Sequence, residues 1–167
     1  MKRIWPMVCS FACLVSFISW PAKAVPSEEL IRANCQPAQY ILNQIEKTDA
    51  ALRINRGRVY NEILDLFYAM NARLASNKIS APKLVEITSK FEDELTNFRA
   101  DYNGYDDTLN QLVDMNCQEH PTDFYNRLGN VRWRRDQLNK RVLELDKLLA
   151  DYQNEFNQNV KATINEK

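Results

Sequence analysis

Apolar residues recur at alternating steps of three and four along three long stretches of the chain, with polar residues between them. This spacing places the apolar side chains on one face of an α-helix, and it predicts helices over about residues 37–77, 81–118 and 121–165. No stretch alternates apolar and polar residues with a period of two, so we expect an all-α fold without a sheet.

Each predicted helix carries one apolar seam, in which the steps average close to 3.5 residues. That average is typical of left-handed, coiled-coil-like packing. The seam of the first helix is Ile41, Ile45, Thr48, Leu52, Asn55, Val59, Ile63, Leu66, Met70 and Leu74. The seam of the second is Leu84, Ile87, Phe91, Leu95, Phe98, Tyr102, Tyr105, Leu109, Leu112 and Met115, and that of the third runs from Phe124 to Ile164.

Prolines and short polar turns separate the three stretches. Pro37 and Pro121 suit the first turn of a helix, where the missing N–H has no partner to lose. Ser80 is the expected N-cap of the second helix, and Ser27 that of a short helical segment before Cys35. Because short connections make neighbouring helices antiparallel, the sequence predicts an elongated antiparallel three-helix bundle over residues 25–167.

The first 24 residues have the three-part pattern of a secretory signal peptide. Lys2 and Arg3 precede an apolar run, and Ala22-Lys23-Ala24 is a small-x-small cleavage site. We therefore expect cleavage after Ala24 and a secreted or periplasmic protein. The alternative is an uncleaved segment in which residues 4–20 anchor the protein in a membrane.

Composition limits the function classes further. Three of the 22 basic residues and none of the 22 acidic ones lie in the signal, which leaves a net charge of −3 on the mature chain. That balance gives no general argument for nucleic-acid binding. The sequence contains no glycine-rich phosphate loop, no His-Glu-x-x-His and no Cys-x-x-Cys motif. We therefore expect no enzymatic activity, no metal and no cofactor.

Two cysteines, Cys35 and Cys117, remain in the mature chain. Folding the first two helices about the turn near Ile79 brings both to the same end of the bundle. An even number of cysteines in an exported chain favours a disulfide, so we predict a Cys35–Cys117 bridge. The alternatives are two buried thiols, or a metal site with His120, which would offer three ligands where structural zinc prefers four.

A polar layer is expected midway along the bundle. The register brings Asn55, Asn103, Gly104, Tyr105 and Arg135 to the same level. We expect Arg135 to reach one of the aspartates at 101 and 106, or to extend along its stem to water. A polar residue in a coiled-coil seam can specify register at a cost in stability. The alternative is a local drift of the seam that leaves Arg135 solvated.

Basic residues gather at the same level and suggest an anion-binding belt of Arg53, Arg56, Arg132 and Arg134. The alternative is that these side chains pair with neighbouring carboxylates on a solvated surface. Trp133, beside the arginines, either shields the core edge or marks an interaction patch. The apolar positions Phe156, Val160 and Ile164 are candidates for self-association.

The segment Asp49–Glu62, "DAALRINRGRVYNE", together with the two cysteines resembles exported helical-bundle proteins of bacteria whose function is not known. The resemblance implies export and an all-helical domain. The stretch "LTNFR" at Leu95 departs at its last position from the Leu-Thr-x-x-Gln motif of helical periplasmic chaperones, so that function is not implied. The expected function is an exported, non-enzymatic module that binds an unidentified protein or cell-envelope component. The alternative is a membrane-anchored spacer or sensor module.

Overall fold

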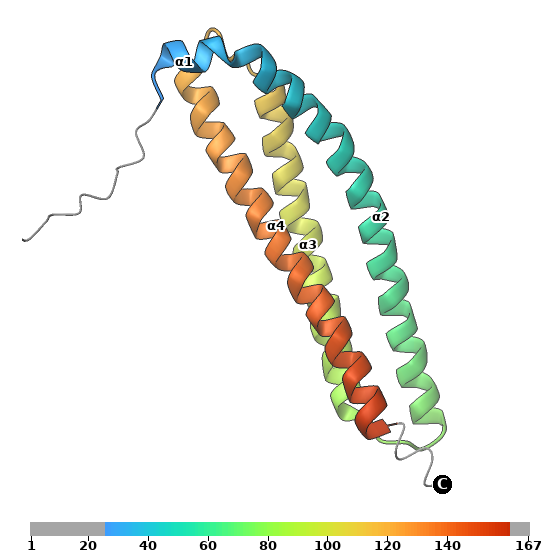
Figure 1. The fold of residues 1–167 in the computed structure, drawn as a ribbon. Helices are drawn as coiled ribbons and strands as arrows, with labels where there is room; N and C mark the ends of the chain where they lie inside the picture. Colours follow the sequence, from blue (N-terminus) through green and yellow to red (C-terminus); the bar gives the residue numbers. More distant parts are fainter. Residues whose placement is uncertain (1–25, 161–167) are drawn as a thin grey trace, which may run out of the picture.

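The computed structural model describes residues 26–160, and these are all-helical (Figure 1). The predicted signal peptide and the expected end of the third helix near residue 165 lie outside the described residues. Within them four α-helices pack against one another and no strand occurs. The elements are α1 (Glu28–Ala33), α2 (Cys35–Ser76), α3 (Pro82–Val113), α4 (Pro121–Glu155) and a π-helical turn, η1 (Phe156–Val160).

The local signals explain most helix starts. Ser27 caps α1, because its hydroxyl oxygen accepts a hydrogen bond from the Leu30 N–H at 3.3 Å. Proline opens α3 and α4, as expected of a residue that has no N–H to satisfy in the first turn. The predicted cap at Ser80 is wrong: α3 is preceded by Ala81, and no side chain caps it. The proline alone therefore marks this start.

The second long helix is shorter than the sequence predicts, because α3 ends at Val113 and not near residue 118. The following residues form a turn around Asn116, whose side-chain oxygen accepts from the Gln118 N–H at 3.0 Å and whose carbonyl accepts from the His120 N–H at 3.0 Å. Asparagine commonly bonds to nearby backbone in this way, which competes with the helix. The turn carries Cys117 toward the start of α2.

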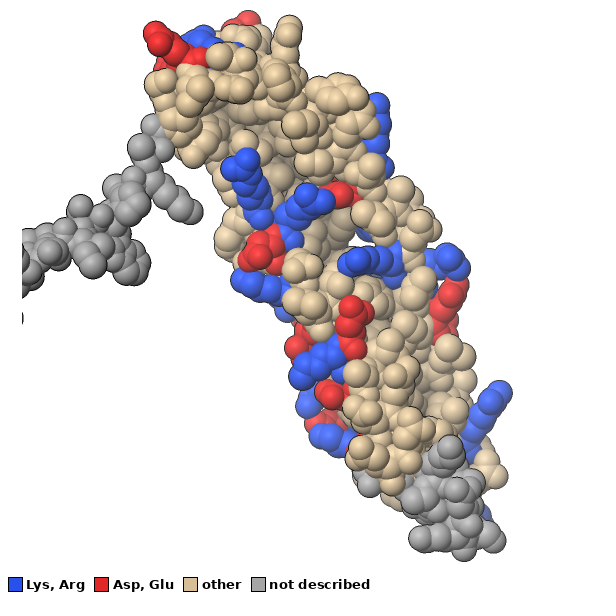
Figure 2. Space-filling model, viewed as in Figure 1, with Lys and Arg blue, Asp and Glu red and all other residues tan. Residues whose placement is uncertain are grey.

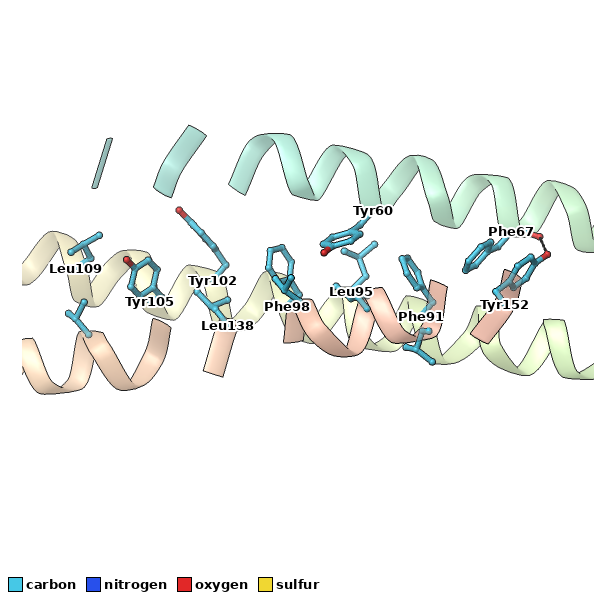
Figure 3. Packing of buried hydrophobic residues seen from close by; sticks show 14 of the residues in the cluster. Tyr60, Phe67, Phe91, Leu95, Phe98, Tyr102, Tyr105, Leu109, Leu138 and Tyr152 are labelled. Carbon is cyan, nitrogen blue, oxygen red and sulfur yellow. Dashed lines mark hydrogen bonds between the residues drawn. The ribbon is translucent and has the colours of Figure 1, made fainter. Parts of the chain in front are cut away.

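Helix α3 lies between α2 and α4 and packs along both (Figure 1). Its predicted seam is confirmed: nine of the ten seam residues, from Leu84 to Leu112, are buried, and Met115 is partly buried. Aromatic rings form much of the contact with the flanking helices. The Tyr60 ring of α2 lies 6.1 Å from that of Phe91 and 5.9 Å from that of Phe98, while Phe67 stacks on Tyr152 at 3.7 Å (Figure 3).

Helix α2 is rotated relative to its predicted seam. The seam residues Ile41, Leu52, Val59 and Leu66 are exposed, and the residues that follow three of them are buried in their place. One residue is about 100° of helix rotation, so at these three positions the inward face of α2 is offset by that angle. The seam residue Leu74 is buried as predicted, and the seam residues Ile45, Ile63 and Met70 pack partly buried against the core. The buried residues of α2 are Cys35, Leu42, Asp49, Tyr60, Phe67 and Leu74.

Candidate functional site

The structure pairs Cys35 with Cys117, as the helix register predicts. The two Cα atoms lie 5.7 Å apart, within the normal range for a disulfide, and both residues are buried. The bridge joins the first residue of α2 to the turn after α3. Among the described residues no group of three potential ligands could hold a metal, so the alternative metal site with His120 finds no support there.

Polar contacts surround the disulfide. The Arg32 guanidinium donates to the Gln118 carbonyl, and the Gln118 amide donates back to the Arg32 carbonyl at 2.8 Å. The Gln39 amide donates to the Met115 carbonyl at 3.0 Å. These bonds tie α1 and the start of α2 to the turn between α3 and α4. This end of the molecule is therefore held by both covalent and polar contacts.

The polar layer forms around Asp49, a residue that the sequence did not single out for it. Asp49 is only 8% exposed, and its carboxylate accepts from the Tyr105 hydroxyl at 2.6 Å and from the Arg135 guanidinium at 3.2 Å. The layer thus contains two of the predicted residues, Tyr105 and Arg135. Arg135 pairs with Asp49 and not with the expected aspartate at 101 or 106.

The other three predicted residues do not belong to it, and Gly104 has no side chain to contribute. Asn55 and Asn103 are both exposed, because the inward face of α2 is rotated away from Asn55 and because Asn103 lies beside, not on, the buried seam of α3. The three side chains that do form the layer link all three long helices: Asp49 is on α2, Tyr105 on α3 and Arg135 on α4.

Buried tyrosines have pKa values above the usual value near 10. Burial, with a smaller contribution from Asp146, raises the pKa of Tyr60 to about 12. Burial also raises the pKa of Tyr105, as does its hydrogen bond to Asp49. Each hydroxyl accordingly stays protonated in the folded chain to a higher pH than in the unfolded chain.

The free energy of unfolding is expected to fall as the pH rises from about 10 to about 12. In that window the unfolded chain loses the Tyr60 proton while the folded chain retains it, so alkali favours unfolding. Urea titrations across the window measure the fall, and tyrosinate absorbance follows the ionisation. The Tyr60→Phe variant should show a shallower pH dependence than the wild type. An identical pH dependence would contradict the raised pKa of Tyr60.

A cavity of about 210 Å³ opens beside the polar layer, between α2 and α4, with α3 as its floor. Figure 2 shows basic side chains around a hollow halfway along the molecule. We call this space the central cavity. Its charged and polar lining is Asp49, Arg53, Arg56, Arg135 and Asn139, and its apolar and aromatic lining is Leu52, Phe98, Tyr102, Tyr105, Leu138 and Val142.

A second space of about 660 Å³, the lower cavity, opens between the same two helices nearer the α2–α3 turn. Ile63, Leu66 and Met70 of α2 line one side of it, and Leu149 of α4 and Phe156 of η1 line the other.

The Tyr60 hydroxyl of α2 donates to Asp146 of α4 at 3.1 Å, at a position along both helices that falls between the two cavities. We call the two cavities together the α2/α4 groove.

The predicted anion-binding belt divides between two places. Arg53 and Arg56 line the central cavity, whereas Arg132 and Arg134 do not. Arg132 is exposed, and Arg134 lies over Gly104 of α3 with its Nε buried and unpartnered among the described residues. The structure therefore does not bring the four arginines together at one cavity.

The remaining candidates differ in their surroundings. Trp133 is 58% exposed on α4. Val160 is buried and Phe156 packs partly buried against the core, so neither offers a free apolar surface for self-association. Ile164 lies outside the described residues.

Alanine substitutions at two glycines, Gly57 and Gly104, are expected to differ in their effect on the free energy of unfolding. A Cβ at Gly57 in α2 would meet no atom within 4 Å, so Gly57→Ala should raise the free energy of unfolding by about 0.5–1 kcal/mol through helix propensity. A Cβ at Gly104 would lie 2.6 Å from Arg134 Nη1 and displace that guanidinium. Gly104→Ala should therefore gain less in urea unfolding. A larger gain at Gly104 than at Gly57 would contradict this placement of Arg134.

Two further findings concern the whole described chain. None of its helices is long and apolar enough to cross a membrane. No family model, curated protein or solved structure matches the sequence or the fold.

Proposed function

We propose that this chain is an exported, non-enzymatic three-helix bundle that binds an amphipathic helix of another protein in the α2/α4 groove. The observation that carries the proposal is the apolar surface left open along α2. Leu52 is 53% exposed and Leu66 is 68% exposed, and each lines a cavity. The two exposed apolar patches lie on either side of the Tyr60–Asp146 contact, and exposed apolar surface on a soluble protein is typical of an interaction site.

The shape of the groove favours a helix as the ligand. Its α2 wall extends from Asp49 to Arg73, which at 1.5 Å per residue is a length of about 36 Å. Helix-in-groove recognition uses apolar side chains at such repeated positions. A helix lying there would cover Leu52 and Leu66 together.

Export is supported by the leader-like pattern of residues 1–24 and by the buried Cys35–Cys117 disulfide, since disulfides persist in oxidising compartments. The mature protein would be secreted or periplasmic. If the leader is retained, residues 4–20 would anchor the same bundle in a membrane, and it would act as an extracytoplasmic spacer or sensor. The intact mass of the protein recovered from an exporting bacterium separates the two forms.

Site-specific photocrosslinking tests the groove. A photoreactive residue at Leu66 in the groove should crosslink a partner in an exporting bacterium, and the crosslinked peptide should map to one amphipathic helix. Val85 is the matched control, because it is 56% exposed on α3 but lines neither cavity of the groove. Equal crosslinking from both positions, or none from Leu66, would overturn the proposal.

A further inference from the structure

Three hydrogen-bond donors face the central cavity without a close acceptor. The Arg53 guanidinium lies 4.6 Å from the centre of the Tyr102 ring, and its nearest carboxylate oxygen, on Asp106, is 4.0 Å away. Arg56 makes no hydrogen bond or ion pair with the described part of the chain. These two side chains therefore have donors available to a ligand.

Tyr102 supplies the third donor. Its hydroxyl is buried, is directed from α3 toward α2, and has no hydrogen-bond partner among residues 26–160 (Figure 3). A buried hydroxyl without a partner costs free energy that an acceptor would recover. Because the Tyr102 oxygen is closed to solvent, the Arg53 side chain over its ring must shift to admit a ligand's acceptor. Burial raises the pKa of Tyr102, which keeps this hydroxyl protonated and able to donate.

The carboxylate already in the lining does not fill this role. Asp49 accepts from Tyr105 and Arg135, so both of its oxygens are engaged. The lining contains three arginines and this one carboxylate, and when Asp106 beside Arg53 is counted as well, the cavity keeps an excess of one positive charge. An incoming anion would be favoured there and an incoming cation disfavoured.

The rest of the lining is apolar and sets the second property of the ligand. Leu52, Leu138 and Val142 stand around the donors. A volume of about 210 Å³ corresponds to about seven water-sized groups, at roughly 30 Å³ each, so the cavity would take the carboxylate and first carbons of a longer chain whose remainder lies outside it. A ligand that fits would carry its charge on an apolar body.

We infer that Arg53, Arg56 and Tyr102 form a recognition site for a carboxylate attached to an apolar body, and this inference rests on the function proposed for the α2/α4 groove. Two sources share this chemistry: an Asp or Glu side chain within the apolar face of a partner helix, and a free fatty acid. The first 25 residues of the chain do not supply it, because they contain Lys2, Arg3 and Lys23 but no acidic residue.

Calorimetric titration of the exported protein with decanoate, below its micelle concentration, tests the site. One decanoate should bind per chain, and decyltrimethylammonium, which has the same tail and the opposite charge, should not compete. Arg56→Gln should weaken decanoate binding by about tenfold, and Tyr102→Phe by a smaller factor, because the first removes a charged donor and the second a neutral one.

Arg58→Gln is the matched control for Arg56→Gln. Arg58 is on the same helix two residues away but lies outside the cavity, where it pairs with Glu62 at 2.7 Å. Its substitution should leave decanoate affinity unchanged. The inference is overturned if decanoate shows no saturable binding, if decyltrimethylammonium binds equally well, or if Arg56→Gln and Arg58→Gln behave alike.

The Leu66 crosslink separates this inference from the proposed function and identifies the source. A crosslink that is lost in Arg56→Gln, on fatty-acid-free protein, identifies a side-chain carboxylate of the partner. A fatty acid released when the exported protein is denatured identifies the free lipid. A crosslink that survives Arg56→Gln, with no decanoate binding, leaves the groove as a binding surface and overturns the carboxylate site.

Discussion

Removal of the Cys35–Cys117 disulfide is expected to lower the free energy of unfolding by about 2–5 kcal/mol. The two cysteines are separated by 82 residues, so the bridge closes a long loop and removes much conformational freedom from the unfolded chain. Urea unfolding at neutral pH, with and without a thiol reductant, measures the difference. The folded state should persist without the bridge, because the helices still pack along their whole length.

The Cys35→Ala/Cys117→Ala variant is the control for effects of the reductant itself. Its unfolding curve should not change with reductant and should resemble that of the reduced wild type. Opening should begin at the bridged end, so amide hydrogens near Leu42 should exchange faster in the variant while those near Phe91 change little. A wild-type curve unchanged by reductant would contradict a structural role for the bridge.

The second long helix shows what periodicity could predict. Helix α3 packs against a helix on each side, and its large apolar residues, with the exception of the exposed Val85, contribute to one broad buried face. Its seam was predicted correctly for that reason. Its end was not, because Asn116 and the bridged Cys117 stop the helix through local hydrogen bonds and a tertiary link that the apolar pattern does not encode.

Helix α2 shows the limit of the same method. It has apolar residues on two adjacent faces, one led by Leu42 and Phe67 and the other by Leu52 and Leu66. The spacing within the second face is the more regular, so periodicity favours that face as the core. In the structure that face lines the α2/α4 groove or meets solvent. A helix with one buried and one exposed apolar face gives no periodic signal to tell them apart.

This rotation explains the errors in the polar layer at Asn55 and Asp49, whereas Asn103 lies beside the seam of α3. With the wrong face inward, Thr48 and Asn55 stood in the predicted core, and Asp49 was placed outside it. Tyr105 and Arg135 were found because they lie on the seams of α3 and α4, whose inward faces were predicted correctly. A buried aspartate has no periodic signature of its own, and only the correct phase of α2 would have revealed it.

The predicted anion-binding belt does not form a single site, for a related reason. The predicted register gives each residue's level along the bundle, but a site also requires a shared direction around the helix axis. Arg53 and Arg56 satisfy both conditions, whereas Arg132 is exposed away from the cavity and Arg134 lies over α3. The Tyr102 donor was absent from the prediction because it sits in an ordinary core position and only its unpartnered hydroxyl distinguishes it.

Replacement of Asp49 with leucine is expected to lower the free energy of unfolding by about 1–3 kcal/mol, because the buried Tyr105 hydroxyl loses its acceptor. Arg135→Leu should cost less, since its side chain is 55% exposed and water can replace the lost partner. A large loss at Arg135 would instead mean that its guanidinium anchors the network. Urea unfolding of both variants gives this order directly.

The double variant Asp49→Leu/Tyr105→Phe decides whether the effect comes from the hydrogen bond. Replacing both buried partners with apolar groups leaves no orphaned hydroxyl, so the double variant should be more stable than the sum of the two single losses predicts. The coupling should be about 1 kcal/mol or more, as expected for residues in direct contact. Strict additivity would show that Asp49 and Tyr105 do not interact in the folded protein. If the double variant regains the stability of the wild type, an apolar layer of the same shape holds α2, α3 and α4 together equally well. The polar layer would then contribute to which faces of these helices meet and not to the free energy of unfolding.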